Sequence, residues 1–354
     1  MLSDDIVLLG LILRNDREAV KAYLENVNLS HDEFKNFADD NRLSGTLYAA
    51  INGPEYKDIF PEHLIAHFKS AYMNQWVINQ LLIKATERLS ELFRSAGVDI
   101  ISLKGPVLAQ RFYGDVAQRA VGDIDILIKN EDLNDSIWLL KENGFGLASR
   151  ILFSKKSTSY FTHHFEYLKK DTKLELHWAL DTHFSFNIDY NRIWREKEEF
   201  AFDNRRFFVL SGEYEIVLQI LSIFKDIQLG TIAMKSFVDI YMILKATNKS
   251  VKWEEFFLAR REEGIYAISI NILDLVLSLF NCGDEFMELS RYMEKNGDDI
   301  KFKDLAKQLQ LLKHSKIAVK KRLWALSLYD AGLAGSVFWW GASLPFRLMV
   351  YKKS

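Results

Sequence analysis

Two carboxylates separated by one residue are the strongest chemical signal in the sequence. Asp123 and Asp125 lie in a stretch that alternates acidic and aliphatic residues before continuing apolar, which predicts a β-strand. Because side chains alternate between the two faces of a strand, both carboxylates point to the same side. Two such charges repel each other unless a cation lies between them, and hard oxygen ligands of this kind suit Mg²⁺ or Mn²⁺. An exposed strand whose acids are simply solvated is the alternative interpretation.

A second strand repeats this alternation. Glu175 and His177 share one face of residues 173–178, so a third carboxylate could face the first two across a sheet. Three carboxylates around a divalent metal are typical of phosphoryl-transfer sites, where the metal binds the attacking and leaving oxygens. An exposed acid and a histidine hydrogen-bonded at a sheet edge explain the same residues without chemistry. His163 and His164 would point to opposite faces of a strand, which argues against joint metal binding by this pair.

A glycine turn with positive charge precedes the acidic pair. Lys104-Gly105-Pro106 predicts a strand-to-helix turn whose free amides and helix N-terminus could hold nucleotide phosphates, with Lys104 adding a mobile charge. An ordinary exposed turn explains these residues equally well. Arg119, four residues before Asp123, could contact a phosphate or neutralise the acidic face, and we favour the second role.

These residues must be positioned by a short α/β stretch that lies between two helical regions. The sequence pattern of residues 1–96 predicts successive helices, with capping boxes at Asn15 and Ser30 and a helix end at Gly97. The stretch 97–210 predicts strands at 98–103, 123–128, 160–168, 173–178 and 206–210, with helices at about 106–113 and 131–143. The third and fourth strands form a hairpin, and the last is an edge strand.

From residue 211 the helical period returns and continues to the end of the chain. The predicted fold class is therefore α+β, with a small mixed β-sheet core flanked by N-terminal and C-terminal helical regions. The predicted domains are residues 1–96, 97–210 and 211–354.

Composition narrows the class of protein. The 354 residues are 49% hydrophobic and 27% charged, as expected for a folded globular chain of about two domains. Lysine and arginine total 46 against 48 acidic residues, so the net charge of -2 gives no general attraction to nucleic acid. The single cysteine, Cys282, excludes an internal disulfide framework and fits a reducing compartment, so we expect a cytoplasmic protein.

An apolar, tryptophan-containing segment lies near the C-terminus at residues 331–350. Gly341, Pro345 and Arg347 interrupt it before it reaches the length of a membrane span. We expect no transmembrane segment there. A helix that closes the C-terminal domain is the favoured interpretation, and peripheral contact with a membrane or a protein is the alternative.

Taken in order, these motifs resemble a bacterial family of largely uncharacterised nucleotidyltransferase-like proteins, relatives of the DNA polymerase β superfamily. The resemblance covers about residues 75–250 and rests on Leu103-Lys104-Gly105, Tyr113, Arg119, Asp123-Ile124-Asp125-Ile126-Leu127, Gly144 and Glu175-Leu176-His177-Trp178. It implies that Asp123, Asp125 and Glu175 are the catalytic residues and the ligands of Mg²⁺ or Mn²⁺. The nucleotide-binding residues it implies are Lys104, Gly105, Arg119 and His177.

The resemblance implies an enzyme that moves a nucleoside monophosphate from an NTP to a hydroxyl of an unidentified small molecule or protein. Two departures from the family pattern matter. The turn has Lys-Gly rather than Gly-Ser or Gly-Gly, with a longer interval to Asp123, and the third acid is Glu175 rather than aspartate. These differences leave open a catalytically weak nucleotide-binding or interaction protein that retains the fold. A glycosyltransferase is disfavoured, because only one strand is predicted before the acidic pair.

Overall fold

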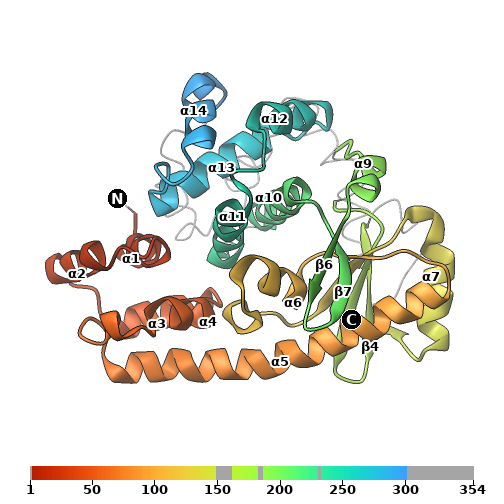
Figure 1. Cartoon of the computed structure of the whole chain (residues 1–354), viewed down its shortest axis with the longest axis horizontal. Helices are drawn as coiled ribbons and strands as arrows, with labels where there is room; N and C mark the ends of the chain where they lie inside the picture. The colour runs from red at the N-terminus through yellow and green to blue at the C-terminus, as the bar shows by residue number, and fades with distance from the viewer. Residues whose placement is uncertain (1, 149–161, 182–185, 230–232, 301–354) are drawn as a thin grey trace.

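The long helix α5 (Glu62–Ser95) spans the molecule and connects its helical part to its sheet (Figure 1). The computed structural model describes residues 2–148, 162–181, 186–229 and 233–300. At 1.5 Å per residue, the 34 residues of α5 extend about 50 Å. One half lies beside the N-terminal helices and the other beneath the sheet, as Figure 1 shows. Gly97 follows with a φ of +75°, which confirms the predicted glycine stop.

Four helices precede α5, and one of their two predicted capping boxes is confirmed. The helices are α1 (Asp4–Leu13), α2 (Arg17–Asn26), α3 (His31–Asp40) and α4 (Ser44–Ile51). Ser30 and Glu33 form the predicted box at the start of α3. The box predicted at Asn15 is wrong, because Asp16 caps α2 instead by accepting a hydrogen bond from the Ala19 amide.

Within the described residues, seven strands form one mixed sheet in the order β3-β4-β5-β2-β1-β7-β6. The strands are β1 (Ile101–Ser102), β2 (Ile124–Leu127), β3 (Gly146–Leu147), β4 (His164–Lys169), β5 (Thr172–His177), β6 (Glu198–Phe202) and β7 (Arg205–Val209). The predicted hairpin is confirmed as the antiparallel pair β4–β5. The predicted edge strand is wrong, because β7 pairs with β1 on one side and with the unforeseen strand β6 on the other.

The strand alternation places apolar side chains on one face of the sheet and acidic ones on the other. Ile124 and Ile126 of β2 are buried in a core shared with α5 and α7 (Leu133–Glu142). Asp125 lies between them in sequence and therefore points to the opposite face. Strands β2 and β5 are parallel, with Asp125 in register with Glu175 and Leu127 in register with His177. The sheet thus brings the two acidic strands side by side.

The turn between β1 and β2 begins with helix α6 (Gly105–Leu108), which continues through a π-helical turn, Ala109–Tyr113. This agrees with the predicted helix at 106–113. Gly105 has a φ of +72°, a left-handed backbone that favours glycine. The helix ends at Gly114, with a φ of +74°.

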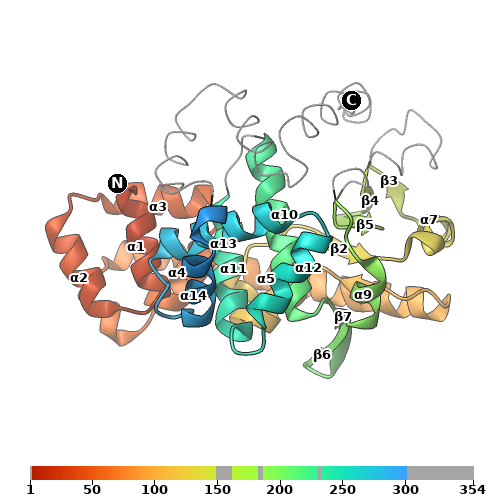
Figure 2. The same ribbon diagram turned by 90° about the horizontal axis from the view of Figure 1, so that it is seen from above.

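Helix α9 (Tyr190–Arg195) lies between β5 and β6. The helices that follow β7 are α10 (Gly212–Leu229), α11 (Met234–Thr247), α12 (Trp253–Glu262), α13 (Tyr266–Phe280) and α14 (Met287–Lys295). In the view from above, α13 and α14 lie next to the N-terminal helices (Figure 2). Helix α13 packs on α1, and residues of both helical regions belong to one hydrophobic core. In the described ranges, no helix has both the length and the apolar character needed to cross a membrane. The apolar segment at residues 331–350 lies outside the described residues.

Candidate functional site

Three carboxylates converge where β2 and β5 lie side by side. Asp123 immediately precedes β2, Asp125 lies within it, and Glu175 is the register partner of Asp125 on β5. Burial raises the pKa of Asp123, and the neighbouring charges of Asp125 and Glu175 raise it further. These acids are therefore close enough to repel one another. The sequence alternation and the parallel pairing together place all three on one face of the sheet.

The ammonium group of Lys173 lies among these carboxylates. Its Nζ is 2.9 Å from Oε1 of Glu175 and 3.4 Å from Oδ2 of Asp123, with Glu166 of β4 at 3.9 Å. Burial alone would lower the pKa of Lys173, but its hydrogen bond to Glu175 and the surrounding negative charge raise it. A permanent positive charge thus occupies the position where an acidic cluster needs a cation.

His177 links two of the acids. Its Nε2 is 3.1 Å from Oδ1 of Asp125 and 3.4 Å from Oε2 of Glu175. Burial by itself lowers the pKa of His177, but these interactions with Asp125 and Glu175 outweigh burial and raise it. Burial likewise would raise the pKa of Glu175, but hydrogen bonds from His177 and Lys173 and the charge of His164 lower it. Glu175 is therefore ionised at neutral pH.

The Lys104-Gly105 turn lies against the acidic pair. A Cβ placed on Gly105 would lie 3.8 Å from the carbonyl oxygen of Asp123, and the amide of Leu103 donates to the carbonyl of Asp125 at 3.0 Å. Lys104 itself turns toward α10, where its Nζ donates to Oγ of Ser222 at 2.7 Å. The glycine thus approaches the acidic strand, while the lysine adds charge next to it.

Further lysines from α10 and α11 gather near Lys104. Burial raises the pKa of Asp226, and three lysines oppose this rise: Lys104, Lys225 and Lys235. Burial lowers the pKa of Lys235 to about 7, and the nearby positive charge of Arg119 adds to this shift. Lys104 and Lys225 also act electrostatically on His163, next to the carboxylates. The positive group therefore lies within Coulombic range of the histidines next to the carboxylates.

The main partner of Arg119 is neither a phosphate site nor the acidic face, the two roles predicted for it. Its side chain is 4% exposed, and its guanidinium donates two hydrogen bonds, of 2.7 and 2.8 Å, to the carboxylate of Asp239 on α11. Tyr113 donates to the same carboxylate at 2.6 Å. Of the acidic pair, Asp125 exerts only a weaker electrostatic pull on Arg119. The physical reason is the buried Asp239, a bidentate partner that α11 supplies.

Several residues of this region were missed in the sequence. Lys173 shares the face of Glu175 and His177 by the same two-residue period, so the sequence alternation already indicated that its side chain lies with theirs. The expectation that His163 and His164 diverge is wrong, because β4 begins at His164 and His163 lies in the bend before it. Their ring centroids are 4.6 Å apart.

A groove of about 1280 Å³ lies beside this region, between α5 and the β4–β5 turn. Its lining includes Gly122 and Thr172, which adjoin Asp123 and Lys173 in the chain, and the apolar side chains of Ile78 and Leu81. The three carboxylates are not part of its lining.

The family described as "Uncharacterised nucleotidyltransferase" matches residues 28–281. Among solved structures, ANT(2'')-Ia in complex with adenylyl-2''-tobramycin is 12% identical with a TM-score of 0.35, over 52% of this chain and 96% of that one. The lincosamide antibiotic adenylyltransferase LnuA, lincomycin-bound, is 16% identical with a TM-score of 0.32, over 48% and 97%.

A third similar structure is an antigenic nucleotidyltransferase-like protein from Paracoccidioides brasiliensis. It is 16% identical with a TM-score of 0.32, over 51% of this chain and 86% of that one. No curated protein matches the sequence.

Proposed function

The chain belongs to the family of uncharacterised nucleotidyltransferases, and from this premise we propose that it transfers a nucleoside monophosphate from an NTP to an acceptor hydroxyl. The observation that carries the proposal is the convergence of Asp123, Asp125 and Glu175 on one face of the sheet. Neighbouring carboxylates of this kind disfavour one another unless positive charge lies among them; Lys173 supplies that charge in this structure, and a divalent ion would supply it in place of Lys173.

The donor set suits Mg²⁺ or Mn²⁺. One ligand atom each of Asp125, Glu175 and His177 lies within 4.8 Å of the others, and Asp123 immediately precedes β2 beside them. The carboxylates are hard oxygen ligands, and the described groups around them include no thiolate. Asp123, Asp125 and Glu175 would hold the ion. When bound, such an ion binds phosphate oxygens of the NTP and stabilises the charge that develops during transfer. The Lys173 ammonium would then move aside from Asp123 and Glu175.

The lysines of the positive group would receive the phosphates. A triphosphate brings about four negative charges, and Lys104, Lys225 and Lys235 lie near Asp226, with Lys104 and Lys225 also acting on His163. Glu175 is ionised and can accept a hydrogen bond from an acceptor hydroxyl, which orients its oxygen toward the reacting phosphorus. His177 holds Asp125 and Glu175 in a fixed relation through its Nε2.

A second candidate is a nucleotide-binding protein with little transferase activity. The position of Lys173 favours it, because an ammonium group already neutralises Asp123 and Glu175. This protein would still bind an NTP through the positive group but would not release pyrophosphate.

Pyrophosphate release tests the proposal and separates the two candidates. The protein is incubated with each of the four NTPs, Mg²⁺ or Mn²⁺ and pools of hydroxyl-bearing acceptors, and pyrophosphate release and labelling of the protein are measured. We expect release that Asp125→Asn abolishes and that the exposed control Asp135→Asn leaves unchanged. Metal-dependent NTP binding without release would support the second candidate. Absence of both binding and release would contradict both.

A further inference from the structure

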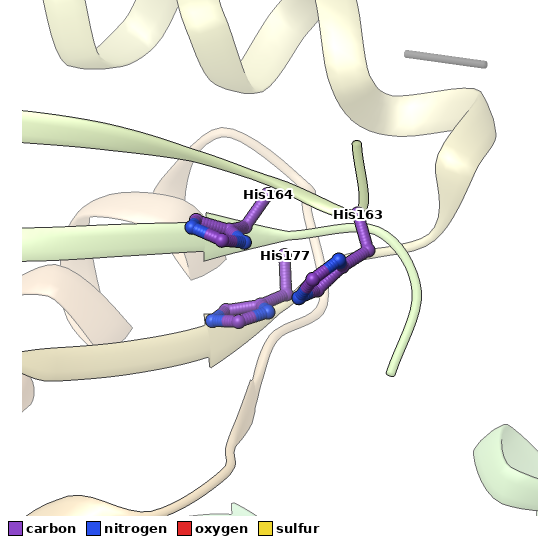
Figure 3. Close-up of side chains that lie close together, drawn as sticks. All are labelled: His163, His164 and His177. Atoms are coloured by element: carbon purple, nitrogen blue, oxygen red, sulfur yellow. The ribbon is translucent and has the colours of Figure 1, made fainter. Parts of the chain in front are cut away.

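Three histidine rings gather beside the carboxylates, at the ends of two adjacent strands (Figure 3). His164 is the first residue of β4 and is in register with His177, the last residue of β5. His163 lies in the bend that precedes β4. The ring centroids of His163 and His164 are 4.6 Å apart, those of His164 and His177 4.9 Å, and those of His163 and His177 5.7 Å. Figure 3 shows the three side chains grouped on the same side of the two strands.

Each of these rings has a buried nitrogen without a hydrogen-bond partner among the described residues. The unpartnered atoms are the Nδ1 atoms of His163, His164 and His177. His163 is 5% exposed and His177 is 8% exposed. A buried polar nitrogen that makes no hydrogen bond costs about 1–3 kcal/mol, and three such atoms within one small cluster need a physical explanation.

The hydrogen bonding of His177 determines which of its nitrogens is available. Its Nε2 lies 3.1 Å from Oδ1 of Asp125, and an ionised carboxylate can only accept, so the proton resides on Nε2. With its proton on Nε2, the ring can bind a metal only through Nδ1, the unpartnered atom, and a metal ion bound there displaces any second proton. A carboxylate that binds the far nitrogen of a histidine is the usual support of a metal-ligating imidazole.

We propose that His163, His164 and His177 bind a transition-metal ion of the Zn²⁺ class, at a site distinct from the three-carboxylate cluster. One ring nitrogen of each residue lies within 4.8 Å of the others. Tetrahedral zinc with Zn–N distances of about 2.1 Å requires nitrogens roughly 3.4 Å apart, so side-chain rotations that close the gap by about 1 Å complete the site. The remaining position belongs to a water molecule, since the nearest carboxylate, that of Glu175, is assigned to the neighbouring cluster.

The ligand chemistry separates this site from the carboxylate cluster. Imidazole nitrogens favour Zn²⁺, Co²⁺ and Ni²⁺, whereas carboxylate oxygens favour Mg²⁺ and Mn²⁺. His177 contacts both clusters, since its Nε2 contacts Asp125 while its ring stacks on that of His164.

Cobalt binding tests the proposal without any activity measurement. The full chain is freed of metals with a chelator and titrated with Co²⁺, whose visible absorption is strong when its coordination is tetrahedral. We expect one Co²⁺ per chain with such an absorption band, displaced by Zn²⁺ but not by Mg²⁺. His163→Gln and His164→Gln should each weaken Co²⁺ binding at least tenfold. The control His67→Gln alters an exposed histidine on α5 that contacts Asp39 and should bind Co²⁺ as the unaltered protein does.

Two further variants separate this site from the carboxylate cluster. Asp123→Asn should keep the Co²⁺ band while weakening Mn²⁺ binding, and His163→Gln should do the opposite. The titration of the unaltered protein is decisive even if a histidine variant does not fold. Absence of a tetrahedral Co²⁺ band, or a band that persists in both folded histidine variants, would overturn the proposal. Neither result depends on whether pyrophosphate is released.

Discussion

Replacing Lys173 with methionine should strengthen divalent-metal binding at the carboxylate cluster. Methionine retains much of the apolar stem but removes the ammonium, which lies 2.9 Å from Glu175 and 3.4 Å from Asp123. If this ammonium occupies the place of the metal, Mn²⁺ must displace it in the unaltered protein. In the variant, Mn²⁺ meets the uncompensated carboxylates directly.

The size of the effect follows from these distances. At the dielectric constant of water, unit charges 2.9 and 3.4 Å apart attract by about 1.4 and 1.2 kcal/mol. The side chain of Lys173 is 35% exposed, so solvent and salt reduce the total to about 1–2 kcal/mol. This free energy corresponds to about 5- to 30-fold tighter Mn²⁺ binding.

The assay is a Mn²⁺ titration of chelator-treated protein at low salt, with free Mn²⁺ measured by electron paramagnetic resonance. The control is Lys252→Met, which removes an exposed lysine 3.1 Å from Glu255 and should leave Mn²⁺ affinity unchanged. The metal-free Lys173→Met protein should also unfold at lower denaturant concentration, and Mn²⁺ should restore its stability. Unchanged or weaker Mn²⁺ binding in this variant would refute the idea that Lys173 occupies the metal position.

Four other substitutions, two of them a matched glycine pair, test the electrostatics and backbone around the site. Arg119→Met leaves Asp239 buried without its cation and should lower the unfolding free energy by about 3–5 kcal/mol in urea titrations, whereas an effect below 1 kcal/mol would contradict a buried pair. Burial raises the pKa of Glu215 to about 8, so the folded state retains a proton that the unfolded state releases above about pH 4.5. Stability should therefore fall between about pH 4.5 and 8, by at most about 1.4 kcal/mol per pH unit, and thermal melts of Glu215→Gln should lack this contribution. Gly105→Ala and Gly97→Ala impose similar backbone strain, at φ +72° and +75°, and each should lower the unfolding free energy by about 1 kcal/mol. Only Gly105→Ala should also weaken NTP binding in equilibrium titrations. Equal NTP affinity in the two variants would argue against a nucleotide-binding turn.

Local periodicity was sufficient to predict the acidic face of the sheet. Alternation within each strand placed Asp123 and Asp125 together, and Glu175 with His177, and the register of β2 with β5 then joined the two pairs. The rule that separated His163 from His164 failed because it holds only inside a strand. His163 lies just before β4, where the bend turns its ring back toward His164.

Long-range partners could not be predicted from a local pattern. Arg119 and Asp239 are 120 residues apart, and only the packing of α11 on the turn before β2 brings them together. Lys225 and Lys235 likewise reach the region of Lys104 from helices whose sequences show only a helical period. The position of β7 inside the sheet depends on its parallel pairing with β1, which no property of its own sequence specifies.

The most direct test is a crystal structure with Mn²⁺ and a non-hydrolysable NTP analogue, in which anomalous scattering locates the metal. The account predicts Mn²⁺ bound directly by oxygens of Asp123, Asp125 and Glu175, at about 2.0–2.3 Å, with the triphosphate extending toward Lys104. The ammonium of Lys173 should have moved away from Asp123. Mn²⁺ bound elsewhere, or a triphosphate that does not approach these carboxylates, would contradict the account.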